Sequence, residues 1–127
     1  MPEFCRRNVL LGAAALPLAG CARPGDAPAA GPPTPGQRMV AVAEVPVGGG
    51  TIVEGTLITQ PSPGVFKGFI ARCTHAGCAL PRVTDGAAVC PCHSSSFGLD
   101  GEVLRGPATE PLRPRAVTVR GTEIVAG

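Results

Sequence analysis

Four of the six cysteines and both histidines of this 127-residue chain lie in two short segments. The first segment, 73–78, reads Cys-Thr-His-Ala-Gly-Cys, and the second, 90–97, reads Cys-Pro-Cys-His-Ser-Ser-Ser-Phe. The other two cysteines, Cys5 and Cys21, lie far from both segments, so only these four cysteines can share a site. The fold is therefore constrained by a site to which both segments contribute.

Within the two segments, cysteine and histidine are spaced as two possible chelates. Cys73 is paired with His75, and Cys90 with His93. Two thiolates and two imidazoles satisfy either one tetrahedral zinc ion or a two-iron cluster. The single residue between Cys73 and His75 argues against zinc, because common structural zinc sites separate paired ligands by two or more residues. A purely disulfide-bonded domain is the remaining alternative, and it leaves both histidines unexplained.

Residues 39–127 are expected to form one small all-β domain. Short β-branched runs alternate with glycine and proline turns, which indicates an antiparallel barrel or sandwich. Since only 3% of the residues are aromatic, the core is expected to consist of Val, Ile, Leu and Ala. The expected strands are 40–47, 51–59, 65–72, 79–84, 87–90, 115–120 and 122–125. Asp85-Gly86 and Asp100-Gly101 are hairpin signals.

The amino-terminal segment, residues 1–20, is expected to direct export. It contains paired arginines, Arg6 and Arg7, which with the residues that follow resemble a twin-arginine signal. The apolar stretch from 9 to 19 has about half the roughly 20 residues that a spanning helix requires, and Pro17 interrupts it. A permanent transmembrane anchor is therefore not expected here.

The export segment ends in a candidate lipidation site. Residues 18–21, Leu-Ala-Gly-Cys, resemble a bacterial lipobox, which implies that Cys21 carries lipid after export. Two acyl chains on this cysteine would anchor the protein stably at a membrane. Residues 21–38 are rich in proline, glycine and alanine and are expected to be a tether. With a net charge of +2 and no basic run, the chain gives no indication of nucleic-acid binding.

The two cysteine segments together resemble those of Rieske [2Fe–2S] proteins, in which two cysteines hold one iron and two histidines hold the other. The ligands implied by the resemblance are Cys73 and Cys90 for one iron, and His75 and His93 for the second. The resemblance also implies a small antiparallel β fold with two cluster-binding loops and a disulfide between Cys78 and Cys92. A third loop, with Gly106 and Pro107, is expected to cover the cluster. Because oxygenase-associated members typically lack the second cysteine pair, the high-potential branch found in cytochrome bc complexes is favoured.

Five positions near the expected cluster bear on its potential or on the loop geometry. Ser94 stands where cytochrome bc-type members usually have glycine, so a turn of positive φ would have to accommodate a side chain. Ala76 replaces a usual shielding leucine, and Gly98 replaces a common aspartate. Ser95 matches a family serine that donates a hydrogen bond to a bridging sulfide. Phe97 stands where many high-potential members have a tyrosine, so the tyrosine hydroxyl is missing here. With one donor present and one absent, an intermediate to high potential is expected.

The resemblance implies an electron-transfer protein tethered at the outer face of the cytoplasmic membrane. The chain is expected to be the iron–sulfur subunit of a cytochrome bc-type complex, with quinol as donor and b- and c-type cytochromes as partners. The alternative is a free-standing, membrane-tethered carrier that serves another exported oxidoreductase. In both cases the chain is a component of an oxidoreductase rather than an enzyme on its own.

Overall fold

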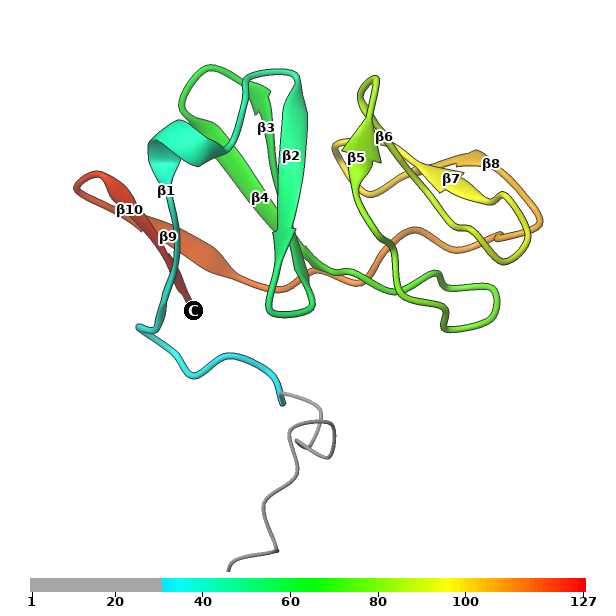
Figure 1. Cartoon of the computed structure of the whole chain (residues 1–127), viewed down its shortest axis with the longest axis horizontal. Helices are drawn as coiled ribbons and strands as arrows, with labels where there is room; N and C mark the ends of the chain where they lie inside the picture. Colours follow the sequence, from blue (N-terminus) through cyan, green and yellow to red (C-terminus); the bar gives the residue numbers. More distant parts are fainter. Residues whose placement is uncertain (1–30) are drawn as a thin grey trace, which may run out of the picture.

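The computed structural model describes residues 31–127, which form ten β-strands and one 3-10 helix (Figure 1). The elements are β1 Arg38–Ala41, η2 Val42–Glu44, β2 Gly49–Val53, β3 Thr56–Ser62, β4 Val65–Ile70, β5 Val83–Thr84, β6 Ala87–Val89, β7 Ser96–Phe97, β8 Val103–Arg105, β9 Val117–Arg120 and β10 Glu123–Ala126. The expected all-β fold is confirmed. No helix within the described part of the chain has the length and apolar character needed to cross a membrane.

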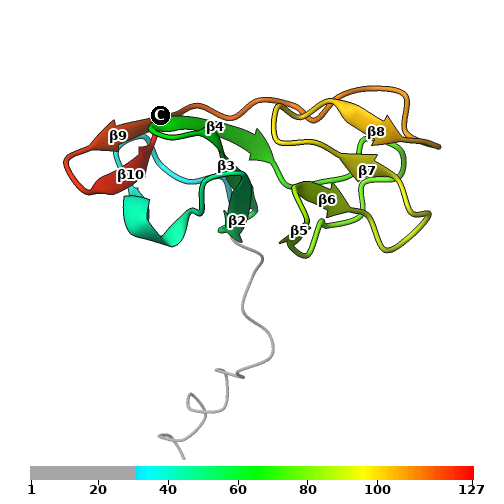
Figure 2. The same cartoon turned by 90° about the horizontal axis from the view of Figure 1, so that it is seen from above.

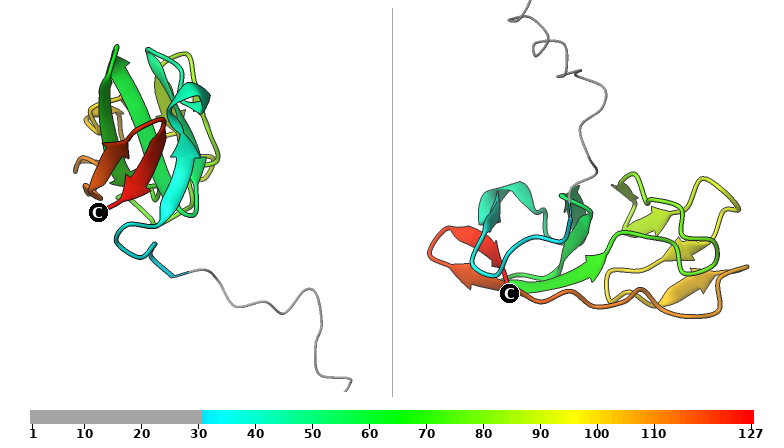
Figure 3. Two further views of the ribbon diagram at one scale, coloured as in Figure 1. Left: turned by 90° about the vertical axis from the view of Figure 1, so that its left-hand side faces the viewer. Right: turned by 90° about the horizontal axis from the view of Figure 1, so that it is seen from below.

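The strands form three antiparallel sheets. Their strand orders are β1-β10-β9, β2-β3-β4 and β5-β6-β7-β8. The four-stranded sheet lies at one end of the molecule, and β2, β3 and β4 separate it from β9 and β10 (Figure 1). Figure 2 shows the segment between β8 and β9 returning from the four-stranded sheet along β4. Seen end-on, the sheet of β1, β9 and β10 lies in front of β2, β3 and β4 (Figure 3).

Strand β3 lies between two hydrophobic cores. Its first five residues, 56–60, are all buried, because both faces of the strand are covered. Leu57 packs into one core and Ile58 into the other, since successive side chains of a strand point to opposite faces. The core on the Leu57 side also contains Phe97, Cys73 and Cys90. The two candidate thiolate ligands are therefore part of the hydrophobic core beside the four-stranded sheet.

Two expected strands are wrong in extent. The run 51–59 is not one strand, because the chain turns at Glu54 and Gly55 and pairs β2 with β3. These two residues have φ of +51° and +69°, and such two-residue turns match the twist of the flanking strands. The run 40–47 is also broken, since η2 follows directly after β1. Apolar content alone did not distinguish one long strand from two elements joined by a turn.

Both predicted hairpins are confirmed in the four-stranded sheet. Asp85 and Gly86, with φ of +50° and +76°, connect β5 to β6. The Asp100-Gly101 pair lies in the connection between β7 and β8. The strands β7 and β8 were not predicted, because two or three residues are too few to show a period of alternation. Most of the expected strand 79–84 is irregular, with only β5 at its end.

Candidate metal centre

The first cysteine segment follows β4 and forms a tight loop. The N–H of Cys73 donates to the carbonyl of Cys78 at 2.8 Å, and the N–H of Gly77 donates to the carbonyl of Cys73 at 2.8 Å. Gly77 has a φ of +75°, a left-handed conformation that glycine adopts readily. The backbone of Cys73 is thus held at both its N–H and its carbonyl.

The second cysteine segment repeats this arrangement after β6. The N–H of Cys90 donates to the carbonyl of Ser95 at 2.7 Å, and the N–H of Ser94 donates to the carbonyl of Cys90 at 3.0 Å. Ser94 takes the place of Gly77 and has a φ of +66°. The positive φ expected at Ser94 is therefore present. Two loops of matching hydrogen-bond pattern each begin with a cysteine.

A disulfide joins the two loops. Cys78 and Cys92 are bonded, with 6.6 Å between their Cα atoms, which confirms the pairing that the resemblance implied. The sulfur atoms of Cys78, Cys90 and Cys92 lie within 4.8 Å of one another. This trio is not a metal site, because the disulfide leaves only Cys90 with a thiol. The disulfide instead holds the loops side by side.

The four candidate ligands form an inner pair and an outer pair. Cys73 and Cys90 are free thiols with 2% and 1% of their surface exposed. His75 and His93 are exposed, and their ring centroids are 4.9 Å apart in an edge-to-face arrangement. Among the described residues, the one group of three potential ligands within 4.8 Å contains no histidine. Two separate pairs suit two metal atoms better than one tetrahedral ion.

Hydrogen bonds prepare one of the inner cysteines, Cys73, for a metal. Burial raises the pKa of the Cys73 thiol, but hydrogen bonds from the backbone of His75 and Ala76 outweigh it. The side chains of Cys90 and Ser95 add two further hydrogen bonds to the Cys73 sulfur. The net result is a pKa below the ordinary cysteine value. Since the thiolate is the form that binds metal, these donors favour metal binding.

A third loop, between β8 and β9, is attached to both cysteine loops. The Thr74 hydroxyl donates to the carbonyl of Glu110 at 2.6 Å, which links the third loop to the first. The backbone N–H of Ala108 donates to the hydroxyl oxygen of Ser95 at 3.0 Å, which links it to the second. Gly106 and Pro107, the expected covering residues, precede Ala108 and are exposed. The third loop thus lies against both cysteine loops, and its covering of a cluster stays a prediction.

Comparison with known proteins agrees with this geometry. The family model of the Rieske [2Fe-2S] domain matches residues 37–120, which is well over half of the chain. This chain belongs to the Rieske [2Fe-2S] domain family. Rieske domains bind a [2Fe–2S] cluster, and the two thiols and two imidazoles of the paired loops are the donor set that this cluster needs.

Relatives of this Rieske domain include iron-sulfur subunits of cytochrome b6-f complexes. The subunit of Synechococcus sp. (strain JA-2-3B'a(2-13)) is 41% identical over 58 residues, covering 45% of this chain and 34% of the relative. The chloroplastic subunit 2 of Nicotiana tabacum is 32% identical over 136 residues, covering 85% of this chain and 59% of the relative. The chain therefore spans about a third to three fifths of these relatives' lengths.

A solved structure shows the same fold. The ferredoxin of Sphingomonas yanoikuyae B1 has a TM-score of 0.57 and 21% sequence identity, and the match covers 72% of this chain and 96% of the ferredoxin. At this identity the likeness concerns the fold alone. The fold of this chain is therefore shared with that ferredoxin.

Two positions where this Rieske domain departs from the family pattern are buried. Phe97 is fully buried between Ala88 and Val103 of the neighbouring strands, and its ring has no donor to offer. A Cβ on Gly98 would lie 2.5 Å from the carboxylate of Glu102. The carboxylate of Glu102 thus occupies the space into which an aspartate at position 98 would extend.

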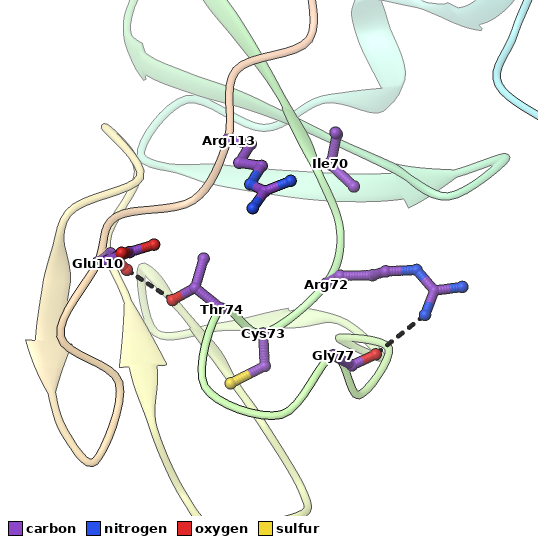
Figure 4. A pocket seen from close by; sticks show the side chains of 7 residues that line it. All are labelled: Ile70, Arg72, Cys73, Thr74, Gly77, Glu110 and Arg113. Atoms are coloured by element: carbon purple, nitrogen blue, oxygen red, sulfur yellow. Dashed lines mark hydrogen bonds between the residues drawn. The ribbon is translucent and has the colours of Figure 1, made fainter.

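A cavity of about 240 Å³ lies beside the first loop (Figure 4). Its lining residues are Ile70, Arg72, Cys73, Thr74, Gly77, Glu110 and Arg113. The Cys73 sulfur points away from Ile70 and Arg113, and the Arg72 guanidinium donates to the carbonyl of Gly77 at 3.0 Å. The cavity therefore lies beside the first cysteine loop, and Cys73 is part of its lining.

The export and lipidation residues lie outside the described part of the chain. Arg6, Arg7 and Cys21 precede residue 31, so the signal and the lipid anchor remain predictions. Thr74 and Ala108, which attach the third loop, were not among the predicted site residues. Ala108 acts through its backbone N–H, and this group is the same in every residue except proline. No sequence signal could have identified it.

Proposed function

We propose that this chain is an electron-transfer protein whose [2Fe–2S] cluster is held by the inner and outer ligand pairs. Cys73 and Cys90 would bind one iron, and His75 and His93 the other. One observation supports this proposal above all. On two loops joined by a disulfide, two thiols are buried, and two imidazoles are exposed and in contact with each other. When bound, the cluster takes up and releases one electron.

The residues around the ligands have distinct proposed roles. The buried cysteines keep one end of the site away from water, while the exposed histidines face the solvent and a redox partner. Each imidazole has two nitrogens, so binding through one leaves the other to exchange a proton or accept a hydrogen bond. The Ser95 hydroxyl would donate a hydrogen bond to a sulfur of the cluster and so stabilise the more negative reduced state. The Phe97 ring has no hydroxyl, so a second such hydrogen bond would be missing.

Metal analysis and spectroscopy test the ligand assignment. The purified protein should contain about two irons and two sulfides per chain, as one [2Fe–2S] cluster requires, with negligible zinc. His75→Ala and His93→Ala should each abolish the Rieske EPR signal. Ser94→Gly is the matched control, because it changes the same loop as His93 without removing a ligand. An unchanged spectrum in either histidine variant would rule out the assignment.

We further propose that the electron donor is a quinol and the acceptor a cytochrome. The proposal is supported by relatives whose names place them in cytochrome b6-f complexes, and by the exposed imidazoles. Copurification from detergent-solubilised membranes tests it. Co-eluting b- and c-type cytochromes would support a subunit of such a complex, whereas their absence would support a free-standing carrier for another exported oxidoreductase.

The proposed location is the outer face of the cytoplasmic membrane, with lipid on Cys21 and residues 21–38 as the tether. The order of the twin-arginine and lipobox motifs supports this proposal. Mass spectrometry of the membrane fraction should find a lipidated amino-terminal Cys21. Cys21→Ala should release or mislocalise the protein. If the variant stays fully membrane-bound and the unsubstituted protein carries no lipid, the apolar leader is the anchor instead.

A further inference from the structure

A buried hydrogen bond connects the third loop to the serine that faces the inner thiols. The N–H of Ala108 donates to Ser95 Oγ at 3.0 Å across thirteen positions of sequence. Ser95 has 0% of its surface exposed and Ala108 has 3%. Water is therefore excluded from this contact, and the hydroxyl must find its partners within the protein.

The direction of this bond restricts the hydroxyl proton. A serine hydroxyl has one proton to donate and lone pairs with which to accept. Because the Ala108 N–H occupies a lone pair, the proton cannot point toward Ala108 and is turned to the other side of the oxygen. The Cys73 thiol is the partner on that side, because a hydrogen bond from the Ser95 side chain is one of the causes that lower the pKa of Cys73.

We propose that the backbone N–H of Ala108 is a positioning group that holds the Ser95 proton on the sulfur side. This inference rests on the proposed electron-transfer function, because its consequence is a reduction potential. A donor held toward sulfur stabilises the added negative charge of the reduced state. Without the Ala108 N–H, the hydroxyl is free to rotate and to turn a lone pair toward the sulfur, which lowers the potential. The third loop thus acts on the cluster through Ser95.

The third loop has other attachments, so this hydrogen bond can be removed separately. The Thr74 hydroxyl holds the carbonyl of Glu110 at 2.6 Å, and the N–H of Leu112 donates to the carbonyl of Gly101 at 2.8 Å. Leu112 is itself buried in the core beside the four-stranded sheet. A change confined to the Ala108 N–H therefore leaves the loop in place.

The test removes the N–H and measures the potential of the cluster-loaded protein by voltammetry. Ala108→Pro lacks the donor, Ala108→Gly keeps it without the side chain, and Thr109→Pro places a proline one position later. Ala108→Pro should lower the potential, and both controls should keep it. In the Ser95→Ala background, Ala108→Pro should produce no further shift, because the positioned group is already gone. An equal shift in that background overturns the proposal.

Two further measurements keep the test decisive. If Ala108→Pro fails to fold, an amide-to-ester replacement at Ala108 removes the same N–H while retaining the side chain. Electron–nuclear double resonance should detect an exchangeable Ser95 proton coupled to the reduced cluster, and the coupling should weaken in the variant. If the unsubstituted protein does not contain about two irons per chain, the proposed function is overturned. Normal iron content with no shift overturns only the role of Ala108.

Discussion

Gly77 and Ser94 close the two cysteine loops at equivalent positions, so each can be replaced by the residue type of the other. Gly77 and Ser94 make equivalent hydrogen bonds at φ of +75° and +66°, but only one of them is glycine. A non-glycine residue in this conformation costs roughly 1–2 kcal/mol. Replacing glycine by serine also restricts the unfolded chain, which returns about 0.4–1 kcal/mol. Nothing lies within 4 Å of a Cβ on Gly77, so no steric cost is added.

Gly77→Ser should therefore destabilise the protein by about 0.5–1 kcal/mol, and Ser94→Gly should stabilise it by a similar amount. The assay is thermal unfolding of the oxidised, cluster-loaded protein at one scan rate, followed by visible absorbance. The expected changes in Tm are a fall and a rise of about 2–8 °C for a domain of this size.

Gly64→Ser is the matched control for this pair. Gly64 has a φ of +80°, and a Cβ added to it would have nothing within 4 Å. It lies in the turn between β3 and β4, away from the cysteine loops. This variant therefore measures the cost of a positive φ alone. If Gly64→Ser lowers Tm while Gly77→Ser and Ser94→Gly leave it unchanged, the cost assigned to a positive φ in the two cysteine loops is refuted.

Three further outcomes are expected. Ser95→Ala should lower the reduction potential measured by voltammetry, and an unchanged potential contradicts the role of Ser95 as a hydrogen-bond donor. Phe97→Tyr should raise the potential if the new hydroxyl reaches a ligand sulfur. Gly68→Ala should lower the free energy of unfolding by about 1–3 kcal/mol, since a Cβ there overlaps the carbonyl oxygen of Arg115. An unchanged midpoint in urea unfolding would mean that the segment at Arg115 moves away from β4 without cost.

Much of the site was readable from the sequence because its residues are few and closely spaced. The motif around Cys78 and Cys92 implied the disulfide that the structure contains. The Asp85-Gly86 dipeptide correctly predicted a hairpin, since both residues must adopt positive φ in such a turn. The equivalent turn at Glu54 and Gly55 was not predicted, because the apolar run on either side concealed it.

The sequence by itself determined the features that depend on residue type and local spacing. These include the two chelating loops, the paired cysteines and the β-rich character of residues 39–127. Local spacing cannot specify which side of a loop is covered, because burial depends on elements that are distant in sequence.

Only the tertiary structure decided that the thiols are buried and the imidazoles exposed, since Leu57 of β3 and Leu112 of the third loop pack in the core that encloses Cys73 and Cys90. The contact of the Ala108 N–H with Ser95 is likewise a product of folding. Every non-proline residue carries the same backbone donor, so only the folded chain selects which one reaches the serine.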